Sequence, residues 1–219
     1  MGINISAASC YISQNKLTKK QVAEKLKSKE AFKVFCDVNI SELDLSGMDF
    51  QDVIFTNVTM EKTVFKNADL CSAKFYHCNL SNADFTEADL TSAEFFYGSV
   101  MHSDFERATL DTAEFNSVTF WDNKVKNANL KGAFFVRTDL ADCSFDNSNL
   151  EGANLSTASF DYTRFCGANC RNVGFYYEPR SDYADFEGAD VTDAKMVIYK
   201  EVPVSEAIIK EKDEDEDKV

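Results

Sequence analysis

A strict five-residue rhythm of apolar positions runs through most of the chain. Every fifth residue from Ile40 to Phe175 is apolar, mostly Phe or Leu, with no insertion or deletion. The residue two places earlier is small and most often Ala. A period of five fits neither an α-helix nor a flat strand, so the backbone has to turn after every short extended stretch. Such short self-similarity predicts a solenoid, in which each repeat contacts only its neighbours.

The identity of the central residue carries a slower rhythm. Between Phe65 and Phe115 the central residues alternate between Phe and an aliphatic residue. Alternation at ten residues requires an even number of repeats per coil, and two repeats leave no room for side chains inside. Four repeats therefore make a coil of about twenty residues with a square cross-section. Residues twenty apart then stack in columns, which predicts two Phe-rich walls and two more aliphatic walls around a dry core.

The pattern divides the chain into an N-terminal segment, residues 1–37, the repeats, residues 38–197, and a C-terminal segment, residues 198–219. An irregular stretch at 176–183 predicts a loop, because its Pro179 cannot donate to a strand ladder. Three repeats then resume one residue out of phase. The C-terminal segment ends in a run of acids that predicts a disordered tail. The short helix expected before the tail either caps the last coil or meets a second subunit, which would give a homodimer.

The N-terminal segment predicts a helical cap. Thr18 and Gln21 have the spacing of a capping box, so we expect a short amphipathic helix, or two, from about Lys19 to Phe35. Such a helix would close the open end of the solenoid, and a helix lying on a membrane surface is the alternative. The first six residues also fit the pattern for N-myristoylation at Gly2.

The charge of the chain limits its partners. The net charge is −14, with seven Lys against three acids in residues 1–40 and an acidic remainder. Direct nucleic-acid binding needs cations to displace counterions, so we expect none. An acidic body favours a basic partner or merely keeps the protein in solution. Seven cysteines without a regular framework, and no apolar run long enough to cross a membrane, predict a cytoplasmic protein.

The repeats closely resemble those of the pentapeptide-repeat family, whose motif is Ala-Asp/Asn-Leu/Phe followed by two variable residues. Matching triplets are Ala68-Asp69-Leu70, Ala88-Asp89-Leu90, Ala128-Asn129-Leu130 and Ala153-Asn154-Leu155. The resemblance implies an all-β solenoid, a right-handed quadrilateral β-helix of about seven to eight coils with a short α-helical cap. Leu43, Met48 and Asn123 depart from the motif, because they stand where Ala is usual.

Catalytic and metal-binding patterns are absent from the sequence. The two histidines fall on outward positions, and Cys166 and Cys170 fall on opposite sides of the wall, so we expect no metal site and no cofactor. Phosphate loops and nucleophile elbows are also missing. We therefore expect a protein that is not an enzyme.

Two surfaces are predicted instead. Acidic residues are expected near one corner, at Asp44, Asp49, Asp69, Asp84, Glu87, Asp89, Asp104, Glu106 and Asp111. Apolar and aromatic residues are expected at another corner, at Tyr76, His77, Phe96, Tyr97, Met101, His102 and Trp121. A column of acids on a rod imitates the charge of a DNA duplex, and clustered aromatics mark protein contacts unless another segment covers them.

These surfaces favour two functions. The segment Phe120-Trp121-Asp122-Asn123-Lys124 resembles a Trp-acid-Asn-basic segment of the Qnr quinolone-resistance branch of the family. That resemblance implies a DNA mimic that modulates DNA gyrase or topoisomerase IV. The alternative is a protein-binding scaffold, or an effector secreted into a host cell, that uses the aromatic corner.

Overall fold

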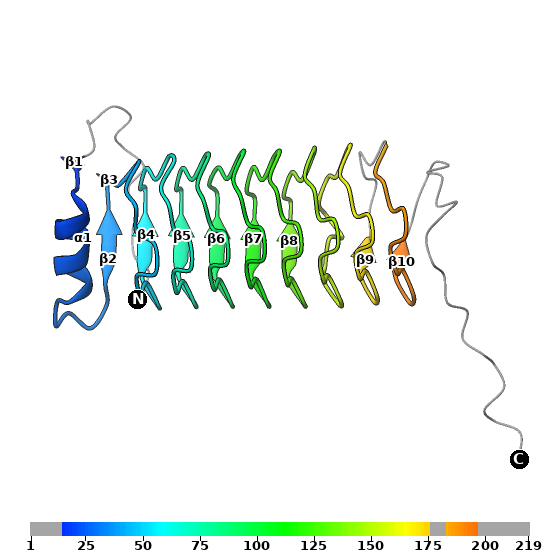
Figure 1. Ribbon diagram of the computed structural model, residues 1–219, viewed down its shortest axis with the longest axis horizontal. Helices are drawn as coiled ribbons and strands as arrows, with labels where there is room; N and C mark the ends of the chain where they lie inside the picture. Colours follow the sequence, from blue (N-terminus) through cyan, green and yellow to red (C-terminus); the bar gives the residue numbers. More distant parts are fainter. Residues whose placement is uncertain (1–14, 176–182, 197–219) are drawn as a thin grey trace, which may run out of the picture.

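The computed structural model describes residues 15–175 and 183–196, which form one parallel β-solenoid with a single short helix at its N-terminal end (Figure 1). The elements are β1 (Asn15–Lys16), α1 (Lys19–Leu26), β2 (Val34–Cys36), β3 (Val38–Asn39), β4 (Ile54–Thr56), β5 (Lys74–Tyr76), β6 (Glu94–Phe96), β7 (Glu114–Asn116), β8 (Phe134–Val136), β9 (Gly174–Phe175) and β10 (Lys195–Met196). The expected loop around Pro179, the acidic tail, the C-terminal dimer contact and the myristoylation pattern lie outside the described residues.

The twenty-residue coil is confirmed by the pairing of the backbone. Strands β2, β4, β5, β6, β7 and β8 form one parallel sheet, in which Phe55 pairs with Phe75 and Phe75 with Phe95. Isolated parallel bridges form the other three walls at the same interval, for example Asp49 with Asp69. Each coil therefore has four short extended sides, and the coils lie side by side along a rod (Figure 1).

The predicted phase shift after the irregular stretch is also confirmed. Arg164 bridges Asp185 and Asn169 bridges Asp190, so the interval becomes twenty-one residues. Strand β10 pairs with β9 at the same interval, Lys195 with Gly174. The repeats thus return to the same walls after the interruption.

The core is a set of stacked columns. Phe55, Phe75, Phe95, Phe115 and Phe135 are almost fully buried, and successive rings stack at centroid distances of 5.0, 4.5, 4.7 and 4.8 Å. These distances match the spacing of parallel strands, about 4.8 Å, so the rings pack at the interval that the backbone sets. The small residue of each repeat is buried beside the rings, because a larger one would not fit between coils.

A left-handed residue marks nearly every corner. The residue two places after each central position has a φ between 52° and 69° along almost the whole rod. Many corners are closed by a hydrogen bond from the third residue after the centre back to the centre, as from the Ala68 N–H to the Phe65 carbonyl at 2.9 Å. This combination is a type II turn. His77, Tyr97 and His102 occupy such positions, so the backbone directs them outward.

The N-terminal cap differs from the prediction in one respect. The capping box is confirmed, with Thr18 and Gln21 bonded reciprocally, but α1 ends at Leu26 and does not reach Phe35. Phe35 belongs to β2, is buried, and stacks on Phe55 at 5.3 Å. It occupies a central position of the five-residue rhythm, so the solenoid already begins at β2, before residue 38. Helix α1, the only helix in the described part, is too short to cross a membrane.

Candidate interaction surfaces

One wall of the rod carries a column of aspartates. Asp49, Asp69 and Asp89 bridge one another on successive coils, and all three are exposed. The Oδ1 atom of each accepts the main-chain N–H two residues further on, at 3.0, 3.0 and 2.9 Å. These Asx-turns explain why the motif favours Asp or Asn at this position. They also fix the orientation of each carboxylate, so the negative charges form a rigid array.

The same column changes chemistry further along the rod. After Thr109 it continues as Asn129, Asn149 and Asn169. The amide of Asn149 donates to Oδ1 of Asn129 at 3.0 Å, and the amide of Asn169 donates to Oδ1 of Asn149 at 2.9 Å. The N-terminal half of this wall is therefore a ladder of like charges, whereas the C-terminal half is a ladder of hydrogen-bonded amides.

The adjoining wall extends the acidic surface. Asp84 and Asp104 bridge each other on neighbouring coils, and Asp44 lies two coils before Asp84 in the same column. A hydrogen bond from Ser46, with Lys19 nearby, lowers the pKa of Asp44. Lys124 follows Asp104 in the column, with their charged atoms 4.0 Å apart, and ends the run of acids.

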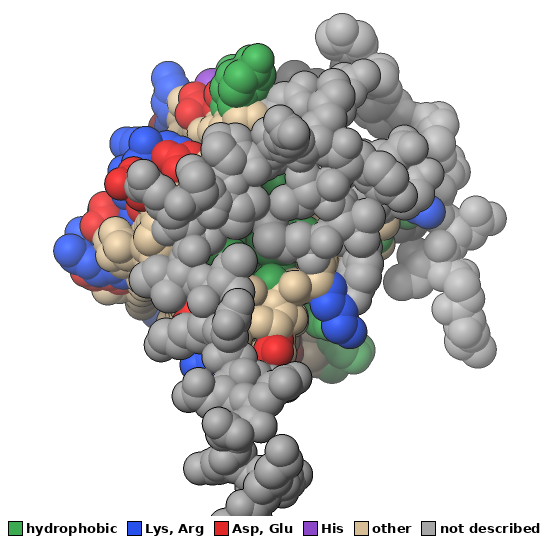
Figure 2. Space-filling model, turned by 90° about the vertical axis from the view of Figure 1, so that its right-hand side faces the viewer, with side chains coloured by type: hydrophobic (Ala, Val, Ile, Leu, Met, Phe, Trp, Pro, Cys, Tyr) green, Lys and Arg blue, Asp and Glu red, His purple; other side chains and the backbone are tan. Residues whose placement is uncertain are grey.

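Glu87 and Glu106 lie around the corner between these two walls and are partly neutralised. Arg107 lies 3.5 Å from the Glu87 carboxylate and 3.6 Å from that of Glu106. Asp111 lies at the next corner, beyond the Asp49 wall. The predicted acidic residues thus cover two adjoining walls and their corners. Viewed along the rod, charged side chains gather on one side, whereas a hydrophobic group beside a histidine protrudes elsewhere (Figure 2).

The aromatic residues divide between two neighbouring corners. At the first corner, Tyr76 stacks on Phe96 and His77 stacks on Tyr97, both at 5.4 Å. Tyr97 is 59% exposed, so this double ladder faces solvent. Each ladder repeats the coil spacing on the outside of the rod, as the Phe columns do inside.

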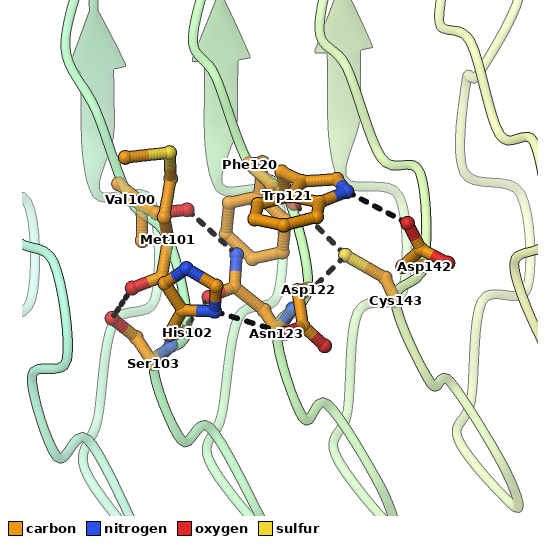
Figure 3. Close-up of polar contacts among 10 residues, drawn as sticks. All are labelled: Val100, Met101, His102, Ser103, Phe120, Trp121, Asp122, Asn123, Asp142 and Cys143. Atoms are coloured by element: carbon orange, nitrogen blue, oxygen red, sulfur yellow. Dashed lines mark hydrogen bonds and ion pairs between the residues drawn. The ribbon is translucent and has the colours of Figure 1, made fainter.

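The second corner lies one wall further on and holds Met101, His102 and Trp121 (Figure 3). The Trp121 ring meets His102 edge to face at 4.9 Å, and its Nε1 donates to Oδ2 of Asp142 at 2.8 Å. His102 Nδ1 lies 2.9 Å from Oδ2 of Asp122. The ring contact with His102 and the hydrogen bond to Asp142 together hold the exposed indole in one orientation.

Asn123 supports this corner from inside. It is buried, its Nδ2 donates to the Val100 carbonyl at 2.8 Å, and its Oδ1 accepts the Ser103 N–H at 2.7 Å (Figure 3). The side chain thus bonds to the two groups that would close an ordinary corner turn. Cys143 does the same one coil later, because its Sγ donates to the Phe120 carbonyl at 2.8 Å. This accounts for the polar residue at an Ala position.

Two exposed tyrosines were missed by the sequence analysis. Tyr162 and Tyr183 stack at 5.0 Å and are 57% and 73% exposed, on the same corner as His102. Their signal is positional, because both have the left-handed φ of an outward corner residue. The one-residue phase shift places Tyr183 at this position as well, three residues before the central residue Phe186.

Two groups of side chains have the residue types of a catalytic or metal site but not its geometry or chemistry: His102 with Ser103, and Cys166 with Asp185 and Glu187. Ser103 follows His102 but is buried, and its hydroxyl donates to the Leu80 carbonyl at 2.8 Å, so it cannot act as a nucleophile for that histidine. Among the described residues, Cys166, Asp185 and Glu187 bring possible ligand atoms within 4.8 Å. Burial, and then the hydrogen bond to Asp185, raise the pKa of the Cys166 thiol to about 11, which opposes a thiolate ligand.

Comparisons with known proteins agree with the repeat pattern. The family model for pentapeptide repeats matches in eight copies, over residues 63–96, 124–156 and 134–172. A trypsin-treated variant of QnrB1, a plasmid-mediated fluoroquinolone resistance protein, is 20% identical over 78% of this chain and 87% of its own, with a TM-score of 0.48. HetL from Nostoc sp. strain PCC 7120, involved in heterocyst differentiation regulation, is 18% identical over 82% and 94%, with a TM-score of 0.29.

Rfr23 from the cyanobacterium Cyanothece 51142 is 16% identical over 78% of this chain and 97% of its own, with a TM-score of 0.29. No curated protein matches the sequence. Similarities this distant carry no argument about function, which has to rest on the surfaces described above.

Proposed function

This chain is a pentapeptide-repeat protein, and on that premise we propose that it acts by binding a basic protein surface along its two acidic walls. The column of Asp49, Asp69 and Asp89 carries this proposal. Three carboxylates of fixed orientation lie at the coil interval, and a rigid array of this kind binds without the entropy loss of ordering flexible side chains. No catalytic step is part of the proposed function.

The contrast within the column supports a role for the charges. An Asn at each position accepts the same main-chain N–H, as Asn149 does from Glu151 and Asn169 does from Arg171, both at 3.2 Å. Asn also adds a hydrogen bond between coils, whereas neighbouring carboxylates repel each other. The fold alone therefore favours Asn. Aspartates that work against stability at three consecutive positions are best explained by a partner that needs negative charge.

A protein that binds duplex DNA is the most specific partner. B-DNA presents a negative charge about every 1.7 Å along its axis, and its protein sites are correspondingly basic. Asp49, Asp69 and Asp89 on one wall, and Asp84 and Asp104 on the adjoining wall, lie on successive coils about 4.8 Å apart and offer such a site a dense negative surface. We therefore propose a DNA mimic that modulates a type II topoisomerase, DNA gyrase or topoisomerase IV.

The test is a supercoiling assay with purified gyrase, and a decatenation assay with topoisomerase IV, with and without a fluoroquinolone. We expect an effect at micromolar protein, and its loss in the variant Asp49→Asn/Asp69→Asn/Asp89→Asn. This variant keeps the Asx-turns and removes only charge. The matched control is Glu94→Gln/Glu114→Gln/Asp139→Asn, which removes three charges from the other two walls of the rod. Wild-type protein without effect on either enzyme, or equal loss in both variants, would refute the proposal.

A second candidate function is a scaffold that holds a protein partner at the aromatic corners. The exposed His77–Tyr97 ladder and the half-buried Tyr76–Phe96 ladder favour it, together with the fixed Trp121 ring, because ordered surface aromatics are typical of binding hot spots. Affinity capture should lose partners with Tyr97→Ala/Trp121→Ala and keep them with Phe32→Ala, which removes an exposed ring of the N-terminal cap. Capture of the same partners by both variants would exclude these corners as the site.

A further inference from the structure

Lysines are concentrated in the cap that closes the N-terminal end of the rod. Between Lys19 and Lys33 the chain carries six lysines against Glu24 and Glu30. Helix α1 packs on the solenoid through Val22, which is fully buried. Most of the lysines are therefore exposed, at Lys19, Lys20, Lys27 and Lys29.

An exposed aromatic ring lies within this basic segment. Phe32 is 73% exposed, and Val34 is 37% exposed. Phe35 occupies the central position of its repeat and stacks on Phe55 in the core column. Phe32 lies three residues earlier, which is an outward position of the repeat. Phe32 lines a shallow hollow with Lys33 and Lys74, and Asp49 and Asp52 line the same hollow. A surface phenylalanine in a lysine-rich segment combines apolar insertion with attraction to negative charge, which is typical of proteins that bind the membrane interface.

The arrangement of charge along the rod determines how a membrane would be approached. The cap lies at one end of the rod (Figure 1). The acidic walls begin on the coils beside it, at Asp44 and Asp49. Side-on contact would bring those carboxylates against lipid phosphates. End-on contact separates the later coils from the surface by more than the Debye length, about 8 Å at physiological ionic strength, so their repulsion is screened.

We infer that the N-terminal cap is a docking surface for anionic phospholipid membranes, with Phe32 inserted at the interface and the rod standing end-on. The acidic walls then remain free for a protein partner. This inference does not depend on the identity of that partner, because it rests on the cap alone.

Co-sedimentation of the full chain with vesicles tests this inference. Binding to vesicles with about 30% phosphatidylserine should exceed binding to pure phosphatidylcholine by at least about tenfold and should weaken with salt. Lys27→Glu/Lys29→Glu should reduce binding about tenfold or more, and Phe32→Ala severalfold. The matched control is Lys62→Glu/Lys66→Glu, which makes the same charge change at exposed positions on the side of the rod and should bind within about twofold of wild type.

Insertion is measured by fluorescence. Trp121 is the only tryptophan, so Phe32→Trp in a Trp121→Phe background reports on the cap alone. Its emission should shift to the blue with anionic vesicles. Equal binding to neutral vesicles, an unshifted emission, or an equal loss in the control variant would overturn the inference. Salt-sensitive self-association that Lys27→Glu/Lys29→Glu abolishes, without vesicle binding, would do the same by assigning the cap to the acidic tail of a second copy.

Discussion

The buried amide of Asn123 gives the sharpest test of the structure. We predict that Asn123→Asp destabilises the fold at neutral pH by about 3 kcal/mol or more, because an unpaired charge enters the interior. The side chain is 1% exposed, and its Nδ2 lies 2.8 Å from the Val100 carbonyl. The substitution places a carboxylate oxygen there, so two acceptors face each other, while the bond from the Ser103 N–H is retained.

The effect should depend on pH in a defined direction. Burial without a cation raises the pKa of the introduced carboxyl above its unfolded value. When protonated, it can donate to the Val100 carbonyl as the amide does. The variant should therefore approach wild-type stability as the pH falls toward the pKa of Asp in the unfolded chain. It should lose stability as the pH rises through the pKa of this carboxyl in the folded protein.

The assay is urea and thermal unfolding followed by circular dichroism at pH 7 and pH 4.5. A loss of about 3 kcal/mol corresponds to a melting temperature lowered by about 6–12 °C for a chain of this length. Asn67→Asp is the matched control, because Asn67 is an exposed corner residue, Asp occurs at the same left-handed position in other repeats, and its change should stay within about 0.5 kcal/mol. Equal melting of the two variants at pH 7, or a pH-independent gap, would refute the assigned hydrogen bonds.

Three further predictions concern charge and thiols. Asp69→Asn should raise the melting temperature by about 2–4 °C, because it removes the repulsion of Asp69 by Asp49 and by Asp89, each up to about 0.8 kcal/mol at 5 Å in water. The gain should shrink in high salt, and no gain would contradict the charge ladder. Burial raises the pKa of the Cys143 thiol, so peptide mapping after alkylation of folded protein at pH 8 should find exposed Cys36 modified and Cys143 modified only after denaturation. Burial opposes the charge of Asp146, but the Ser144 hydroxyl, and then the cations Arg164 and Lys126, outweigh burial and lower the pKa of Asp146. The stabilisation from this carboxylate is therefore present above the unfolded pKa and lost as the pH falls, so Asp146→Asn should flatten the acid limb of the stability curve, and an unchanged limb would exclude this.

The coil and its walls could be predicted because the sequence repeats without interruption. Core positions depend on backbone register, and register over many repeats is visible in the spacing alone. Phe35 shows the limit of that reasoning. Its helix-like spacing from the preceding apolar residues competed with its place in the five-residue rhythm, and stacking on Phe55 decided in favour of the strand.

The candidate surfaces were predictable as outward positions but not as contacts. Position in the repeat placed Trp121 outside, yet only the structure shows the bond to Asp142 that fixes its ring. The sequence shows that Asn123 is unusual at an Ala position. The structure explains it, because the amide bonds to the corner turn one coil earlier. The twenty-residue coil already placed Asn129, Asn149 and Asn169 in one column, but only the structure shows the hydrogen bonds between their amides.

The left-handed corners separate the evolution of the surface from that of the fold. At His77, Tyr97 and Tyr162 the backbone has the same conformation as at the glycine Gly132, so the direction of each corner side chain does not depend on its identity. A bulky residue at such a position carries some conformational strain but meets no packed neighbour inside the rod. Mutation can therefore change the recognition surface one corner at a time, while the Phe columns and the register of the coils stay as they are.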